Sequence, residues 1–374
     1  MRNFFFKSKK IGIFNEIIFL KITIFQLFIL IKYILMKYQT NRNIKSYNFQ
    51  IKYFNKLNIL NELIKIYAIL YDSYRDGYTK PKFLNKNYSY FSIKQDKLGI
   101  CICSIAKNEN LYIKEFINYY YLLGVDKIII YDNNDIEGET FDNILKYYIN
   151  NHFIEIIDVR GISSIQIPIY NYCYKKNKDI YDWIGFIDID EYLYIKNEKS
   201  IKNYFFSNRF KKCQTIYFNW IIYSDNDKIK YENKPLNKRF TIQKSTSIEG
   251  KSFVRGGFNN LIMPTTMIPG INIYYFCNSN GGNIYPRNFY NNKFEKNPKA
   301  YIKHYYTKTV EEFCYKLCKG NAHFNKFHHN YNNIIKGRIN LFFLLNKITK
   351  EKIKILENCT GINLQKYLKK ENNL

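Results

Sequence analysis

The feature that most constrains this chain is a regular alternation of apolar runs and helical patterns between residues 98 and 189. The apolar runs are continuous, as in strands that are buried on both faces of a sheet. The segments between them carry apolar residues at helical spacing. This pattern predicts an α/β protein with a mostly parallel sheet and helices on both faces. The expected strands are 98–105, 127–131, 153–157 and 183–189, and the expected helices are 110–123, 141–149 and 167–174.

Polar side chains follow three of these strands. The first strand ends in Lys107, Asn108 and Glu109, the second in Asp132, Asn133 and Asn134, and the fourth in residues 188–191. Right-handed crossovers place the carboxyl ends of parallel strands at one edge of the sheet. Ligands bind at that edge in open α/β sheets. The sequence therefore predicts a binding site that is built from these strand ends.

Asp188 and Asp190 give the sharpest signal among them. They alternate with Ile187 and Ile189, so on extended backbone both carboxylates would point the same way. Two carboxylates so close repel each other unless a cation lies between them. A hard divalent ion, Mn²⁺ or Mg²⁺, bound to a diphosphate would suit this pair, because it stabilises a leaving diphosphate as a Lewis acid. The simpler alternative is an acidic loop after a buried strand.

Several sequence blocks carry a resemblance to a known group of enzymes. They occupy residues 104–109, 115–125, 131–134, 166–171, 182–191, 220–226, 239–240, 251–255 and 304–316. In order and rough spacing this part of the chain, from about residue 98 to about 325, resembles the nucleotide-sugar transferases of the Rossmann-like GT-A fold. The likeness is to family 92 and to related family 2-like enzymes. Residues 256–300 match that pattern poorly.

The resemblance implies a metal-dependent, inverting glycosyltransferase that moves a sugar from a nucleotide diphosphate sugar to a hydroxyl of a glycan or glycolipid. The implied donor-binding residues are Asn108, Glu109, Asp132, Asn133, Gln166, Asp188, Lys251 and Arg255, the last two facing the diphosphate. The implied metal ligands are Asp188, Asp190 and His304, with Mn²⁺ or Mg²⁺ as the metal. For the general base we favour Asp225, with Glu191 and Asp227 as rivals.

The chain outside this domain is strongly basic. Residues 1–97 hold 18 basic and 5 acidic side chains, and the net charge of the whole chain is +27. We expect a basic helical region at 1–75, a linker at 76–97, the transferase domain at 98–330 and a basic helical C-terminal arm at 331–374. Such basic flanks favour an anionic membrane surface as a partner. A nucleic acid is less favoured, because the basic and aromatic residues form no recognisable nucleic-acid module.

Residues 11–36 are apolar but are interrupted by Glu16, Lys21 and Lys32. We expect a helix that lies in the membrane interface; a true span and a helix packed on the protein's own core remain alternatives. The eight cysteines have no disulfide-type spacing, and Cys101 and Cys103 resemble small buried apolar residues. These features together predict the cytoplasmic face of a membrane.

Two other classes of function are weighed against a transferase. One is a peripheral membrane or nucleic-acid binding protein with a degenerate, inactive core, which explains the charge but leaves the carboxylates without a role. The other is a nucleotidyltransferase of the pyrophosphorylase type, which carries a glycine-rich loop after the first strand. Residues 106–109 lack those glycines, so this class is disfavoured.

Overall fold

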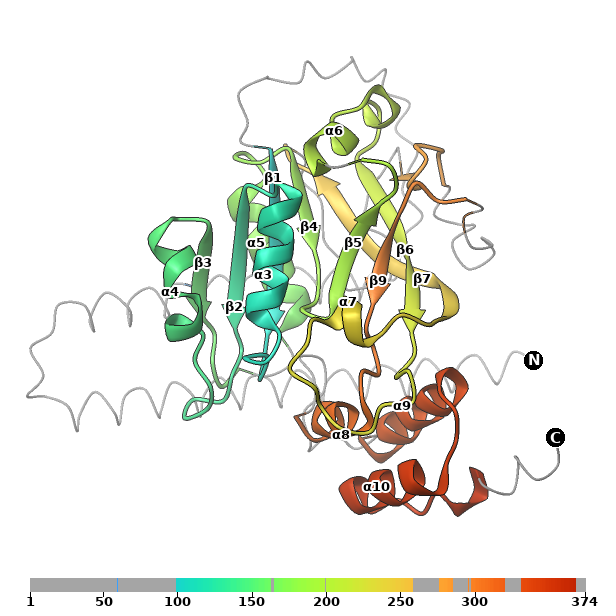
Figure 1. Ribbon diagram of the computed structural model, residues 1–374. Helices are drawn as coiled ribbons and strands as arrows, with labels where there is room; N and C mark the ends of the chain where they lie inside the picture. Colours follow the sequence, from blue (N-terminus) through green and yellow to red (C-terminus); the bar gives the residue numbers. More distant parts are fainter. Residues whose placement is uncertain are drawn as a thin grey trace, which may run out of the picture.

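The computed structural model describes residues 99–162, 165–198, 200–257, 276–284, 297–319 and 331–367, together with positions 59 and 295. Their centre is a nine-stranded sheet in the order β3-β2-β1-β4-β7-β6-β9-β5, with β8 beside β6 (Figure 1). The strands are β1 (Ile100–Ala106), β2 (Lys127–Asp132), β3 (Ile154–Asp158), β4 (Trp183–Phe186), β5 (Glu191–Ile195), β6 (Thr215–Tyr223), β7 (Gln243–Arg255), β8 (Phe276–Cys277) and β9 (Ala300–His304). The short helices α6 (Ile201–Phe205) and α7 (Leu236–Arg239) lie in the connections.

The half of the sheet that the alternating pattern predicted is parallel. β1 pairs in parallel with both β2 and β4, and β2 pairs in parallel with β3. Beyond β4 the sheet is mixed, because β7 runs antiparallel to β4 and β6, and β5 runs antiparallel to β9. The α/β class is confirmed, and parallel pairing holds without exception only in the β3-β2-β1-β4 half.

Helices cover both faces of the parallel half, as predicted (Figure 1). On one face are α3 (Ile113–Leu123) and α4 (Asp142–Asn150). The other face is covered by α5 (Gln166–Asn177), which packs on the side chains of β1 that point away from α3. In α3, Ile113, Phe116, Ile117 and Tyr120 form the buried stripe, and the helix ends at Gly124 with φ +92°. Only glycine adopts that conformation without strain.

Three helices lie together beyond the carboxyl ends of the parallel strands (Figure 1). They are α8 (Val310–Lys319), α9 (Tyr331–Leu345) and α10 (Lys350–Thr360). Phe313 of α8, Phe342 of α9 and Leu356 of α10 belong to one buried apolar cluster. The predicted helical character of the C-terminal region is confirmed for α9 and α10. The predicted boundary at residue 330 cuts through this cluster, so α9 and α10 are part of the domain rather than an arm.

The cysteine interpretation was wrong for four of the eight residues. Cys103 is bonded to Cys173, which joins β1 to α5, and Cys213 is bonded to Cys277, which joins the start of β6 to β8. The paired residues are 70 and 64 positions apart in sequence, so no local spacing reveals them. Cys101 is a buried free thiol, as expected.

Apart from position 59, the predicted N-terminal helical region and the whole of the predicted linker lie outside the described residues. Within the described ranges, no helix combines the length and the apolar character that a membrane span requires. The interfacial helix at 11–36 therefore stays a prediction.

Candidate active site

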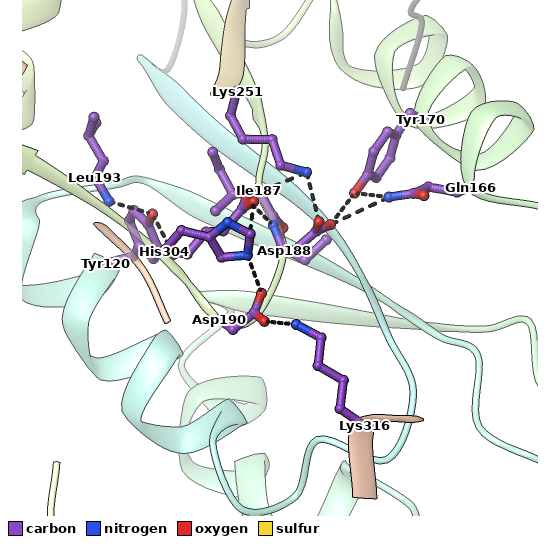
Figure 2. Close-up of polar contacts among 12 residues, drawn as sticks. Tyr120, Gln166, Tyr170, Ile187, Asp188, Asp190, Leu193, Lys251, His304 and Lys316 are labelled. Atoms are coloured by element: carbon purple, nitrogen blue, oxygen red, sulfur yellow. Dashed lines mark hydrogen bonds and ion pairs between the residues drawn. The ribbon is translucent and has the colours of Figure 1, made fainter. Parts of the chain in front are cut away.

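The acidic segment after β4 forms a turn. Glu191 N donates to Asp188 O at 3.0 Å, and Glu191 begins β5. The expectation of extended backbone was therefore wrong, because the chain reverses here to enter β5. As a result the two aspartates do not share a direction: Asp188 points toward Tyr170 and Gln166, while Asp190 points toward Lys316 (Figure 2).

Asp188 is held by residues from two other elements. Tyr170 OH donates to its Oδ1 at 3.0 Å, and Gln166 Nε2 donates to the same oxygen at 3.4 Å. Both residues lie on α5, one turn apart, so the N-terminal part of that helix faces the carboxylate. Lys251 Nζ on β7 is 2.8 Å from Oδ2. Gln166, Asp188 and Lys251, which the resemblance implies as donor-binding residues, thus lie together, and their contact with a donor stays a prediction.

Glu191 and Lys251 form the buried floor of the site. Lys251 Nζ is 3.5 Å from Glu191 Oε2, and that oxygen also accepts from Asp188 N at 3.0 Å. Burial raises the pKa of Glu191 well above its usual value, against the attraction of Lys251. Burial lowers the pKa of Lys251, but the nearby Asp188 and Glu191 carboxylates more than reverse this. The lysine therefore remains a fixed positive charge beside Asp188.

Asp190 is buried and faces a different cation. Its Oδ2 is 2.7 Å from Lys316 Nζ of α8, and its Oδ1 is 3.7 Å from His304 Nε2. Burial alone would raise the pKa of Asp190, but Lys316, His304 and Lys308 outweigh it and hold that pKa well below the usual range. Asp190 is therefore ionised at neutral pH.

His304 ends β9 opposite Glu191, its register partner on β5. Its ring lies 4.5 Å from that of Trp220, measured between ring centroids. Burial lowers the pKa of His304 to about 3, so the imidazole is neutral at pH 7. Its buried Nδ1 has no hydrogen-bond partner among the described residues. A neutral imidazole with an unused nitrogen has the chemistry of a metal ligand.

The metal prediction can be compared with this donor set. Two carboxylates and a neutral imidazole suit Mn²⁺ by chemistry. Within the described residues, however, no three His, Cys, Asp or Glu side chains are gathered closely enough to hold a metal ion. Asp188 and Asp190 each face a lysine ammonium instead. The metal therefore stays a prediction, and no coordination geometry follows from this arrangement.

The neighbouring strand ends lie at the same edge of the sheet. Ala106 and Asp132 are register partners at the ends of β1 and β2. Asp132 is buried; burial raises its pKa to about 6, although it accepts from Asn134 N and faces Arg160. Two carbonyl oxygens, from Val159 and Ile162, accept hydrogen bonds from Asn133 Nδ2, so that amide orders the loop after β3.

The turn after β1 is joined both to this edge and to α8. Asn108 has φ +51°, and its N–H donates to Asn134 Oδ1 at 2.6 Å. Glu109 pairs with Lys319 of α8, and in the part of the chain that the structure describes its buried Oε2 has no hydrogen-bond partner. The placement of Asn108, Glu109, Asp132 and Asn133 at one edge is confirmed; their contact with a nucleotide stays a prediction.

Arg255 is not part of this site. Trp183 at the start of β4 is its register partner, at the end of the strand remote from Asp188. Its guanidinium lies 4.2 Å from the Trp183 ring centroid and donates to the carbonyl oxygens of Cys213 and Phe210, both at 2.7 Å. The prediction that Arg255 faces the diphosphate was wrong, because β7 is long enough to carry Lys251 and Arg255 to different depths of the sheet.

Asp225 also differs from its predicted role. Its carboxylate is buried, and Oδ2 is 2.7 Å from Lys352 Nζ of α10. Lys352 also contacts the exposed Asp227 at 3.0 Å. No contact joins Asp225 to Asp188 or Asp190 among the described residues. The structure thus places Asp225 and Asp227 in the attachment of α10, whereas Glu191 lies directly beneath the acidic turn.

The family model described as Glycosyltransferase family 92 matches residues 96–337, a range that includes every residue of the site described above. This chain belongs to glycosyltransferase family 92. Among curated family 92 proteins, one from Ricinus communis is 28% identical over 96 residues, and one from Oryza sativa subsp. japonica is 23% identical over 161 residues. These alignments cover 26% and 42% of this chain but only 17% and 27% of those proteins.

Among solved structures, a crystal structure of S. aureus TarS 1-349 in complex with UDP-GlcNAc matches 71% of this family 92 chain and 80% of its own chain. The sequence identity is 13% and the TM-score is 0.29, so the likeness carries no argument about function.

Several residues of this family 92 site were not assigned a role from the sequence. Tyr170 and Lys316 lie in sequence blocks that carry the resemblance, but the resemblance implies no role for them. Nothing in the sequence points to Lys319 or Arg160. The one available signal was the capping box of Thr309 and Glu312, which predicts a helix just after His304. The structure confirms it: Thr309 N donates to Glu312 Oε2, and Glu312 N donates to Thr309 Oγ1. Lys316 and Lys319 lie one turn apart on that helix, and both face the site.

Proposed function

We propose that this family 92 protein is a glycosyltransferase that takes a sugar from a nucleotide diphosphate sugar and passes it to a hydroxyl of a glycan or glycolipid. The observation that supports it most directly is the pairing of the acidic turn with cations from separate elements. Lys251 and Lys316 flank Asp188 and Asp190 at the carboxyl ends of parallel strands. A nucleotide diphosphate carries negative charge that such ammonium groups bind well.

The proposed division of roles follows the edge of the sheet. Glu109 and Asp132, after β1 and β2, would receive the nucleoside through carboxylate hydrogen bonds. Lys251 and Lys316 would face the diphosphate. Asp188, Asp190 and His304 would hold a divalent metal, Mn²⁺ or Mg²⁺, which when bound would supply Lewis-acid stabilisation of the departing diphosphate. Lys251 and Lys316 lower the electrostatic free energy of bringing a negatively charged donor beside the two aspartates, whichever cation accompanies the donor.

We further propose inversion by direct attack of the acceptor hydroxyl, with a carboxylate as general base. Glu191 is now the stronger candidate, because Asp225 is committed to Lys352. Glu191 Oε1 is buried, and no residue that the structure describes forms a hydrogen bond with it. Because burial raises the pKa of Glu191, a base in this position would lose activity as the pH falls through that raised value.

The test is a thermal-shift screen of nucleotide sugars with Mn²⁺, followed by transfer or donor-hydrolysis assays with Asp190→Ala. The correct donor should raise the melting temperature by mass action. Asp190→Ala should reduce turnover by roughly a hundredfold or more, as loss of a charge-stabilising group does. Asp179→Ala, at an exposed position after α5, should behave as the wild type. Full activity in Asp190→Ala would reject the role proposed for Asp190, and a wild-type protein that neither transfers nor hydrolyses any donor would favour a degenerate core and a purely binding protein.

We also propose that the basic N-terminal region holds the protein on a membrane surface, through the apolar segment 11–36 and its flanking lysines. The predicted location is the cytoplasmic face. Deletion of residues 1–60 should then release the protein from sedimented membranes. An unchanged membrane fraction would reject this attachment.

A further inference from the structure

Four of the buried polar atoms that lack a hydrogen-bond partner among the described residues belong to the proposed donor site or to the loop that follows His304. They are Glu109 Oε2, Glu191 Oε1, His304 Nδ1 and Thr307 Oγ1. A buried donor or acceptor without a partner is costly, and in native proteins such atoms usually await a ligand, ion or water. Two of the four lie on β9 and on the loop that leads from it into α8, which also contains Lys308.

Lys308 is the most unusual residue of that loop. Its side chain is almost fully buried, with 5% of the residue exposed. Its ammonium lies over the ring of Tyr112, with Nζ 3.9 Å from the ring centroid. It forms no hydrogen bond and no ion pair with the residues that the structure describes. The attraction of an aromatic face replaces only part of the hydration that a buried ammonium loses.

The other lysines of the site are satisfied. Lys251 pairs with Asp188, Lys316 with Asp190 and Lys319 with Glu109. Lys308 interacts electrostatically with Asp190 and Glu109 without pairing with either, so it lies near both the acidic turn and the end of β1. This is the region where the nucleoside end and the sugar end of a donor would meet, and where its diphosphate would lie.

The backbone at Lys308 is held in a conformation that a lysine adopts at a cost. Its φ is +53°, in the left-handed region that favours glycine. Hydrogen bonds fix the loop on both sides, since Tyr305 N donates to Asp190 O and Thr309 forms the capping box of α8. Residues whose strained backbone is held in place by the surrounding structure in this way cluster at ligand-binding positions.

We infer that Lys308 binds the diphosphate of the nucleotide donor, with its ammonium donating to phosphate oxygens. This inference rests on the proposed function and adds to it a residue that carries no other assignment. In the transfer, the bond from the anomeric carbon to the diphosphate oxygen breaks and its electron pair stays on that oxygen. The acceptor oxygen bonds to the anomeric carbon and gives its proton to the base. Lys308 stabilises the charge that develops on the leaving diphosphate.

The electrostatics of Lys308 agree with this role. Burial lowers its pKa, and the neighbouring Lys316 and Lys319 act in the same direction, against Asp190 and Glu109. A bound diphosphate would supply the missing counter-charge and stabilise the ammonium.

The experiment is calorimetric titration of the full chain with UDP, inorganic pyrophosphate and uridine. Lys308→Met removes the charge and keeps the length of the side chain; Lys308→Arg keeps the charge. The matched control is Lys303→Met, because Lys303 on β9 also lies over a ring, that of Tyr194, with Nζ 4.4 Å from its centroid. Thermal melts establish that each variant is folded.

We expect Lys308→Met to weaken binding of UDP and pyrophosphate about tenfold or more, the usual effect of losing a charged hydrogen bond. Uridine should bind equally to all variants, Lys308→Arg should retain most of the affinity, and Lys303→Met should match the wild type. Wild-type affinity for UDP and pyrophosphate in Lys308→Met would overturn the inference. If Lys308→Met does not fold, Lys308→Gln replaces it. Failure of both uncharged variants to fold would make the residue structural and would equally overturn the inference.

The two proposals fail separately. If pyrophosphate binds through Lys308 but no nucleotide sugar is bound or cleaved, the transferase proposal is wrong and the anion site stands. If sugar transfer proceeds normally in Lys308→Met, the transferase proposal stands and the inference is wrong.

Discussion

At the scale of single residues, His304 connects the chemistry of the site to the stability of the fold. Burial lowers its pKa to about 3, whereas an unperturbed histidine titrates near 6.5. Between these values the unfolded chain binds a proton that the folded chain does not. The contribution of a neutral His304 to stability is therefore complete above pH 6.5 and is lost as the pH falls toward 3.

We accordingly expect the free energy of unfolding to fall more steeply from pH 7 to pH 4 in the wild type than in His304→Gln, by about 2–3 kcal/mol. Urea denaturation across this range measures the difference. The raised pKa of Asp132 acts in the opposite direction, but it is present in both proteins and cancels. His152→Gln, at an exposed position, is the control. Equal slopes for His304→Gln and the wild type would show that His304 is not buried as a neutral ring.

At the scale of secondary-structure elements, the attachment of α10 depends on one buried ion pair. The side chains of Lys352 and Asp225 are each 1% exposed, and Nζ lies 2.7 Å from Oδ2. Thr349 caps the helix by accepting from Lys352 N, and Gly361 ends it with φ +69°. The pair thus fixes α10 to the end of β6, beside the helix that carries Lys316.

Lys352→Met should lower the free energy of unfolding by about 3–5 kcal/mol, because it leaves the Asp225 carboxylate buried and unpaired. Urea denaturation at pH 7 measures this, and Lys350→Met, at an exposed position of the same helix, should change it by less than about 1 kcal/mol. Adding Asp225→Asn to Lys352→Met should restore part of the loss.

Lys352→Met also distinguishes Asp225 from Glu191 as the general base. Without Lys352 the pKa of Asp225 should rise further, since that ion pair now opposes the effect of burial. If Asp225 is the base, the acidic limb of the activity profile will move to higher pH. If Glu191 is the base, the limb will stay where it is.

At the scale of the whole molecule, one disulfide joins the sheet to α5 and the other joins the start of β6 to β8 within the sheet. We expect mass spectrometry of the unreduced protein to find Cys103–Cys173 and Cys213–Cys277, with Cys101, Cys314, Cys318 and Cys359 free for alkylation. Replacing Cys213 and Cys277 by serine should cost about 2–4 kcal/mol of stability. Alkylation of all eight cysteines without reductant would contradict the pairing and would agree with the predicted cytoplasmic face. Persistent disulfides in the protein taken from its native cell would instead indicate an oxidising compartment.

The sequence by itself determined the local features of this protein. Continuous apolar runs identified β1 to β4, helical spacing identified α3, and the Thr309–Glu312 pattern identified the start of α8. The parallel class then brought Asn108, Asp132 and Asp188 to one edge without any knowledge of side-chain packing. These inferences hold because they depend on neighbours along the chain and on one topological rule.

The tertiary structure alone decided the contacts between distant segments. It turned the chain at Asp188–Glu191, so that the two aspartates face different lysines, and it brought Lys251 to the site while holding Arg255 at the far end of β4. It also paired cysteines 70 and 64 residues apart and committed Asp225 to α10. Such contacts depend on strand order, register and helix docking, which are set by the packing of the whole domain and leave no periodic trace in the sequence.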